Sequence, residues 1–97
     1  MARKYFRLVE VIKSCGVDEE FILRLEHENM IRPIVRQRGK LYPLDQVDRV
    51  RVARLLIEEM GVNLEGTEVA LHMREQMIAM QRQVDKLLRL LVEEFKK

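Results

Sequence analysis

The stretch Cys15–Asn29, CGVDEEFILRLEHEN, decides the fold expected for this chain of 97 residues. Glycine suits the left-handed position after a helix, so Gly16 is expected to end a short helix that carries the apolar cluster of residues 8–12. Asp18 can then cap a second helix, along which apolar residues recur at spacings of three and four and predict one buried face. That face comprises Phe21, Ile22, Leu25 and, at its end, Asn29. Two helices joined in this way form a helix-turn-helix motif.

The charge of the second helix contrasts with that of the segment that follows it. Between Asp18 and Glu28 the chain carries five acidic residues and one arginine, whereas the next basic run contains no acid. The outward-facing residues of the helix are candidates for contact with a partner: Asp18, Glu19, Glu20 and Arg24. Carboxylates in a first turn also favour the positive N-terminus of a helix, so helix stability is the alternative explanation for them.

The basic run is expected to lie on a β-hairpin, or wing. Pro33 bars continuation of the helix. The apolar pairs at 34–35 and 41–42 indicate two short strands with a turn near Arg38–Gly39. The candidate contact residues of this wing are Arg36, Arg38 and Lys40. They could contact DNA phosphates or an acidic protein patch, and the alternative is that basic hairpin tips serve solubility and edge protection.

Two further helices are expected after the wing. Pro43 suits the beginning of a helix, and the three-four rhythm of apolar residues from position 47 to 60 predicts about four turns, which Gly61 ends. Asn63 is a favoured cap, and residues 64–95 contain no proline. The sequence therefore predicts a single long helix at the C-terminal end of the chain.

A heptad stripe runs along this long helix from Ala70 onward. The stripe residues proposed for dimerisation are Met73, Met77, Met80, Val84, Leu87 and Leu91. The three shorter helices can satisfy one another, and a helix about 45 Å long outreaches so small a core, so we expect a homodimer. Leu88, Leu90 and Val92 broaden the stripe, which would also suit a small bundle. The alternative is that the helix folds back on its own domain.

Length and composition favour one core. We divide the chain into a winged helix-turn-helix domain, residues 1–62, and a C-terminal dimerisation helix, residues 63–97. With 47% hydrophobic and 35% charged residues the chain is globular rather than disordered, and its net charge of +2 is too small to argue for nucleic acid. A single cysteine and the lack of a secretory signal pattern indicate a cytoplasmic protein. No apolar run is long enough for insertion in a membrane.

No constellation of residues suggests catalysis. His27 and His72 lie far apart and lack neighbouring ligands, so we expect no metal and no cofactor. Cys15 has no evident activating base and is expected to be a small core residue. Ser14 and Thr67 offer no triad. We therefore expect a binding protein rather than an enzyme.

Five motifs, taken in their order along the chain, resemble the MerR superfamily of winged helix-turn-helix regulators. They are Tyr5-Phe6-Arg7-Leu8, Gly16-Val17, Met30-Ile31-Arg32-Pro33, Leu41-Tyr42 and Gly61-Val62-Asn63-Leu64. The resemblance covers the whole chain. It implies a mainly α fold, a MerR-like winged helix-turn-helix with a small β-hairpin wing and a long C-terminal coiled-coil helix.

The second helix departs from the pattern of this superfamily. Its members usually carry Leu-Arg-Tyr-Tyr-Glu in the DNA-reading helix, where the arginine and tyrosines commonly contact the phosphate backbone. The matching positions here read Ile22-Leu23-Arg24-Leu25-Glu26, with Leu23 in place of the arginine. The DNA contacts of the superfamily therefore do not carry over to this helix.

Two subfamilies share shorter motifs with the chain. The stretch Gly61-Val62-Asn63-Leu64-Glu65-Gly66 resembles the HspR-type heat-shock repressors of chaperone genes. Val17-Asp18-Glu19-Glu20 and Val69-Ala70-Leu71 resemble the chaperone modulator CbpM subfamily, whose members bind the J-domain of a DnaJ-like co-chaperone. We rank a CbpM-like modulator first, because the J-domain that members of this subfamily bind presents a basic helix. Such a helix would suit the acidic start of the second helix of this chain. A DNA-binding transcriptional regulator is the alternative.

Overall fold

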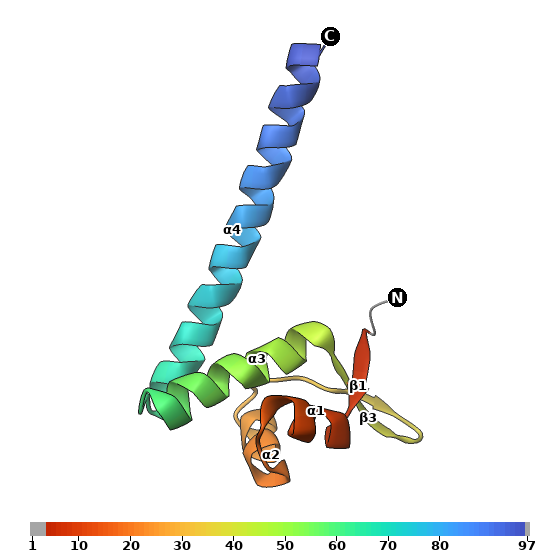
Figure 1. Cartoon of the computed structure of the whole chain (residues 1–97), viewed down its shortest axis with the longest axis vertical. Coiled ribbons are helices and arrows are strands. Elements are labelled where there is room, and N and C mark those ends of the chain that lie inside the picture. The colour runs from red at the N-terminus through yellow and green to blue at the C-terminus, as the bar shows by residue number, and fades with distance from the viewer. Residues whose placement is uncertain (1–3, 97) are drawn as a thin grey trace.

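A computed structural model describes residues 4–96 of the chain, which form four α-helices, one π-helix and three strands. The short elements gather into one domain, and the last helix extends from it (Figure 1). In chain order the elements are β1 (Tyr5–Arg7), α1 (Leu8–Cys15), α2 (Glu19–His27), β2 (Ile34–Arg36), β3 (Gly39–Pro43), α3 (Leu44–Arg54), η1 (Leu55–Glu59) and α4 (Leu64–Lys96). The prediction of a mainly helical, winged helix-turn-helix fold is confirmed.

The junction between α1 and α2 follows the local signals in the sequence. Gly16 ends α1 in the left-handed conformation, with φ of 68°, and its backbone N–H donates to the carbonyl of Ile12. The Asp18 carboxylate accepts a hydrogen bond of 2.8 Å from the backbone N–H of Phe21 and so caps α2. The expectation that Asn29 extends the buried face is wrong, because α2 ends at His27 and Asn29 is exposed, with φ of 58°.

The hairpin belongs to a larger sheet than the sequence predicts. Strand β3 lies in the middle, with β2 and β1 antiparallel on either side. Arg36 pairs with Gly39, so the turn residues are Gln37 and Arg38, one position before the predicted turn. Strand β1 was not predicted, because three residues are too few to show an alternating pattern and their pairing partner lies far along the chain.

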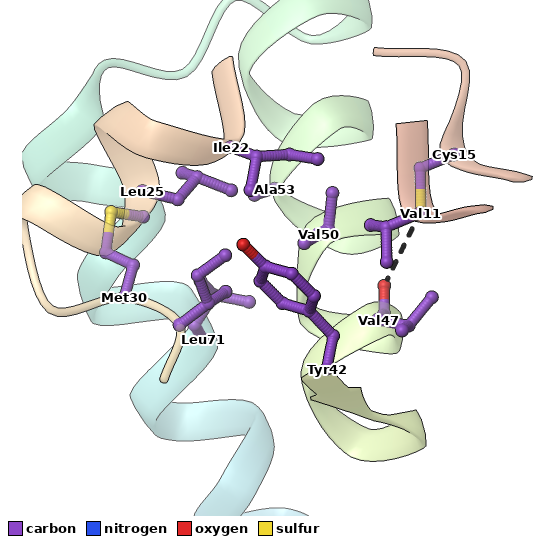
Figure 2. Packing of buried hydrophobic residues seen from close by; sticks show 11 residues of the cluster. Val11, Cys15, Ile22, Leu25, Met30, Tyr42, Val47, Val50, Ala53 and Leu71 are labelled. Atoms are coloured by element: carbon purple, nitrogen blue, oxygen red, sulfur yellow. Dashed lines mark hydrogen bonds between the residues drawn. The ribbon is translucent and has the colours of Figure 1, made fainter. Parts of the chain in front are cut away.

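The core lies between the sheet, α1, α2, α3 and the first turns of α4. Figure 2 shows Tyr42 in the centre of this cluster, surrounded by aliphatic side chains from the helices. The buried residues are Val11, Cys15, Ile22, Leu25, Met30, Ile31, Tyr42, Val47, Val50, Ala53 and Leu71. With one aromatic among them, the core is nearly all aliphatic, as the low aromatic content predicts.

The third and fourth helices begin and end close to the predicted positions. Helix α3 begins directly after Pro43 and widens at Leu55 into the π-helix η1, a change that the apolar rhythm did not reveal. Gly61 follows with φ of 68°. The Asn63 side chain then accepts a 2.7 Å hydrogen bond from the backbone N–H of Gly66, which confirms it as the cap of α4.

The first turns of α4 are part of the core. Thr67 and Leu71 are fully buried, and the Thr67 hydroxyl donates to the carbonyl of Asn63 at 2.9 Å. Arg49 on α3 links α3 to α4, because its guanidinium forms an ion pair with Glu75. The Nε of the same side chain donates to the carbonyl of Met30 at 2.7 Å. The long helix therefore begins as a structural member of the winged domain, and the division at residues 62 and 63 stays a prediction.

After the Glu75 ion pair with Arg49, helix α4 extends away from the domain (Figure 1). Its 33 residues correspond to a length of about 50 Å. The six stripe residues proposed for dimerisation, Met73, Met77, Met80, Val84, Leu87 and Leu91, are each between 48% and 69% exposed in the single chain. The helix does not fold back on its own domain, so the stripe is uncovered in this chain.

Replacing Leu71 with alanine should lower the free energy of unfolding by about 2–5 kcal/mol, because the change leaves a cavity in a core that cannot fully collapse. Urea denaturation at a fixed protein concentration measures the effect. Val69→Ala is the matched control, since Val69 lies on the same helix and is 59% exposed. Similar losses in both variants would show that α4 is not part of the core.

Candidate functional site

A groove with a volume of about 860 Å³ lies between the start of α1, helix α2 and the tip of the hairpin. Most of its lining surface is apolar. The apolar lining residues are Leu8, Val9, Leu23 and Leu41, and the charged ones are Arg7, Glu19, Arg36, Arg38 and Lys40. Three elements that are distant in the sequence thus form a mixed apolar and basic surface on the domain.

Two exposed aliphatic side chains give the groove its apolar character. Val9 on α1 is 61% exposed, and Leu23 on α2 is 43% exposed. Each lies on a helix whose other face supplies the core, through Val11 and Ile22 respectively. Successive helical residues are separated by about 100° around the axis, so these two side chains are directed away from the core and toward solvent.

The structure divides the acidic residues predicted to bind a partner. Glu19 lies in the groove, together with the wing residues Arg36, Arg38 and Lys40. The other three predicted residues, Asp18, Glu20 and Arg24, line a separate depression of about 220 Å³ beside Glu58 of η1. The predicted set therefore belongs to two neighbouring surfaces on the two sides of α2.

A polar network ties the hairpin to α2. Lys40 on β3 forms an ion pair of 3.0 Å with Glu26, and the buried hydroxyl of Tyr42 donates to the same carboxylate at 3.3 Å. The Glu26 side chain is only 12% exposed. The charge of Lys40 is therefore largely balanced within the chain, which leaves Arg36 and Arg38 as the wing cations more available to a partner.

This network also changes the acidity of Tyr42. Burial raises the pKa of the Tyr42 hydroxyl well above its usual range, and the negative charge of Glu26 and its hydrogen bond with the hydroxyl raise it further. A smaller contribution in the same direction comes from the charge of Glu19. The phenol is thus held in its neutral form as a hydrogen-bond donor.

Sequence analysis missed several residues of the groove: Arg7, Val9, Leu41 and the supporting Glu26. Val9 belongs to the apolar cluster of residues 8–12, which is too wide to be buried on one face of a helix. The cluster therefore indicates that one of its side chains is exposed. For Leu23, the departure from the superfamily pattern does not by itself predict a place in a groove. Its position outside the three-four spacing of Ile22 and Leu25 already indicates an exposed apolar side chain.

Cys15 is a core residue, as the sequence predicts. Burial raises the pKa of the Cys15 thiol, which contacts the carbonyl of Val47 at 3.8 Å from within the core. Among residues 4–96 no group of three or more His, Cys, Asp or Glu side chains could hold a metal ion. In the same part of the chain, no helix is long and apolar enough to cross a membrane.

A comparison with known protein families decides the assignment. Residues 6–89 match the model of the MerR HTH family of regulatory proteins, from β1 through most of α4. The chain belongs to this family. The MerR resemblance is therefore confirmed, whereas the CbpM-like or HspR-like subfamily stays a prediction. Searches of curated proteins and of solved structures gave no match.

In this MerR-family chain, Tyr42→Phe should reduce the loss of stability at alkaline pH. The unfolded phenol ionises near its ordinary pKa of about 10, whereas the folded phenol, with its raised pKa, stays protonated. The unfolded state then binds fewer protons, so stability is retained below pH 10 and falls above it, by up to about 1.4 kcal/mol per pH unit. Urea denaturation across this pH range measures the slope. An equal slope in both proteins would show that Tyr42 is not linked to folding in this way.

Proposed function

We propose that this MerR-family chain is a non-catalytic regulator that acts by binding another protein, as a CbpM-like modulator of the J-domain of a DnaJ-like co-chaperone. The observation that carries the proposal is the chemistry of α2. This helix occupies the DNA-reading position of the helix-turn-helix, yet it exposes the carboxylates of Asp18, Glu19 and Glu20 and the aliphatic side chain of Leu23.

The charge of α2 is unfavourable for contact with a DNA backbone. From Asp18 to His27 the chain has four carboxylates and one arginine, a net charge of −3 with histidine neutral. Proteins gain affinity for DNA mainly by neutralising phosphates with Lys and Arg. Carboxylates that approach those phosphates are repelled, whereas a basic protein surface attracts them and guides the encounter. A basic helix, such as the J-domain of the CbpM partners presents, would suit the depression lined by Asp18 and Glu20.

A DNA-binding regulator of the HspR type is the second candidate. The observation in its favour is that Arg36 and Arg38 stand at the tip of the hairpin, where a winged domain contacts the backbone of a duplex. The family match itself supports a regulator and does not distinguish the two candidates.

We further propose that the protein is a homodimer joined through α4. The stripe from Met73 to Leu91 is exposed along one helix that extends from the domain. Full burial of an aliphatic side chain of this size contributes about 1.5–3 kcal/mol, so a second copy that covers several of them would be stabilising. The heptad spacing of three and four is the spacing of a coiled-coil seam.

The choice between the two functions can be tested with the double variant Asp18→Asn and Glu20→Gln. Asparagine still accepts the capping hydrogen bond from Phe21, so α2 should remain folded while two negative charges are lost. Binding of the J-domain of a DnaJ-like co-chaperone should weaken, and its dependence on salt should become less steep. Isothermal titration at two salt concentrations measures both effects.

Glu65→Gln with Glu68→Gln is the matched control, because it removes two exposed carboxylates from the start of α4. This control should leave J-domain binding unchanged. If the wild-type protein binds duplex DNA tightly and selectively at physiological salt and forms no J-domain complex, the hypothesis of a DNA-binding regulator is correct. In that case the α2 double variant should bind the duplex more tightly, because repulsion from the phosphates has been reduced.

The dimer can be tested by placing charge in the stripe. Wild-type protein should sediment at about twice the mass of one chain, and the variant Met80→Glu with Leu87→Glu should sediment as a monomer, because burying unpaired carboxylates is costly. Ala79→Glu is the control, since Ala79 is adjacent in the helix but outside the stripe. A wild-type chain that remains monomeric at high micromolar concentration would remove the proposal.

A further inference from the structure

The groove combines two features that neither proposed function requires together. Its apolar residues come from three elements, with Val9 on α1, Leu23 on α2 and Leu41 on β3. Arginines surround them, from Arg7 at the end of β1 to Arg36 and Arg38 at the hairpin tip. A ligand that fills the groove must therefore offer both an apolar surface and negative charge.

We propose that this groove is the docking site of a second protein segment, an acidic amphipathic helix with large aliphatic or aromatic side chains on one face and carboxylates beside them. In this arrangement the apolar face covers Val9 and Leu23. The carboxylates pair with Arg36 and Arg38, whose planar guanidinium groups match carboxylates well.

The charges of the lining select an acidic segment. Lys40 is balanced by Glu26, which leaves Arg7, Arg36 and Arg38 against the single carboxylate of Glu19, three positive charges against one negative, or +2. Complementary charge improves both the encounter rate and the specificity of a protein contact. A basic segment would be repelled here, although it would be attracted to the Asp18 and Glu20 surface on the other side of α2.

The apolar residues favour a protein segment over a nucleic acid. A phosphate backbone gains nothing from exposed Val9 and Leu23, and it is repelled by Glu19. An aliphatic side chain removes both of these residues from water, which is the usual source of affinity when an amphipathic helix lies in an apolar groove. The volume of about 860 Å³ accommodates several side chains, as one or two helical turns present.

This proposal is separate from binding of a J-domain. The groove lies on the hairpin side of α2, whereas Asp18 and Glu20 line the depression beside η1. The Arg36→Gln with Arg38→Gln variant, which changes only the hairpin side of the groove, should therefore leave the binding of a J-domain's basic helix unchanged. The Asp18→Asn with Glu20→Gln variant should leave groove binding unchanged. Failure of one proposal can be distinguished from failure of the other.

The test is selection of a random peptide library displayed on phage against the full-length protein, followed by fluorescence titration of the selected peptides. Selected peptides should be rich in Asp and Glu and should carry aliphatic or aromatic residues at helical spacing. Leu23→Ser should weaken their binding about tenfold, since the lost burial of one aliphatic side chain is of that size. Arg36→Gln with Arg38→Gln should also weaken it, more strongly at low salt than at high salt.

The control variants lie at exposed positions of α4. Val69→Ser replaces another exposed aliphatic residue with serine, and Arg82→Gln with Arg89→Gln replaces another pair of arginines with glutamine. They should bind the peptides as the wild-type protein does. Selection of basic or neutral peptides, or binding that Leu23→Ser and the double arginine variant leave unchanged, would overturn the proposal.

Two other occupants give distinct results. If mixed-sequence duplex DNA binds more tightly than any selected peptide, and the arginine variant weakens it while Leu23→Ser does not, the groove is a nucleic-acid site and the proposal is wrong. The C-terminal peptide of residues 84–97, which contains Glu93, Glu94 and Phe95, tests a second copy of this chain. Saturable binding of that peptide in the groove, in place of library peptides, would show that the occupant is a second copy.

Discussion

The contact between Tyr42 and Glu26 fixes how the hairpin sits against helix α2, and the groove depends on it. Tyr42 belongs to β3, the middle strand of the sheet, and its ring fills the centre of the core, so this strand cannot shift without disrupting the packing around it (Figure 2). Its hydroxyl meets the Glu26 carboxylate, which also holds Lys40 from the same strand. The nearly buried Glu26 carboxylate is costly to displace, because loss of either Lys40 or the Tyr42 hydroxyl would leave its negative charge poorly compensated. The wall formed by the hairpin and the wall formed by α2 are thereby held in one arrangement.

The parts of this fold that the sequence predicts are those set by local chemistry. Gly16 and Asn63 act within a few residues of their own positions, and both have the predicted role. Strand β1 exists because it pairs with β3, more than thirty residues away, and three residues carry no pattern of their own. The hydrophobic rhythm likewise predicted α4 but not the burial of Leu71, because a heptad stripe does not show where the domain stops covering the helix.

The candidate site was predicted in part for the same reason. Outward-facing residues of a helix can be identified from periodicity, but the surface that each one joins depends on what packs beside the helix. Glu19 and Glu20 are adjacent in the sequence, about 100° apart around the axis, and they belong to different depressions because the hairpin borders one side and η1 the other. Val9 and Leu23 become one apolar surface only after α1, α2 and the hairpin meet, so no single stretch of sequence contains that surface.

These placements separate the proposed binding surfaces from the stripe proposed for dimerisation. The two surfaces beside α2 lie on the winged part of the molecule, whereas the uncovered stripe lies beyond Leu71, on the part of α4 that leaves the domain. The two regions share the start of α4, where Leu71 enters the core and the Arg49 ion pair with Glu75 holds α3 to the helix. Changes at sites more than about 10 Å apart with no common partner usually have additive effects. Surface charge can therefore change at α2 without altering the exposed stripe along α4, so the proposed binding surfaces and the proposed dimer seam can vary independently on one framework.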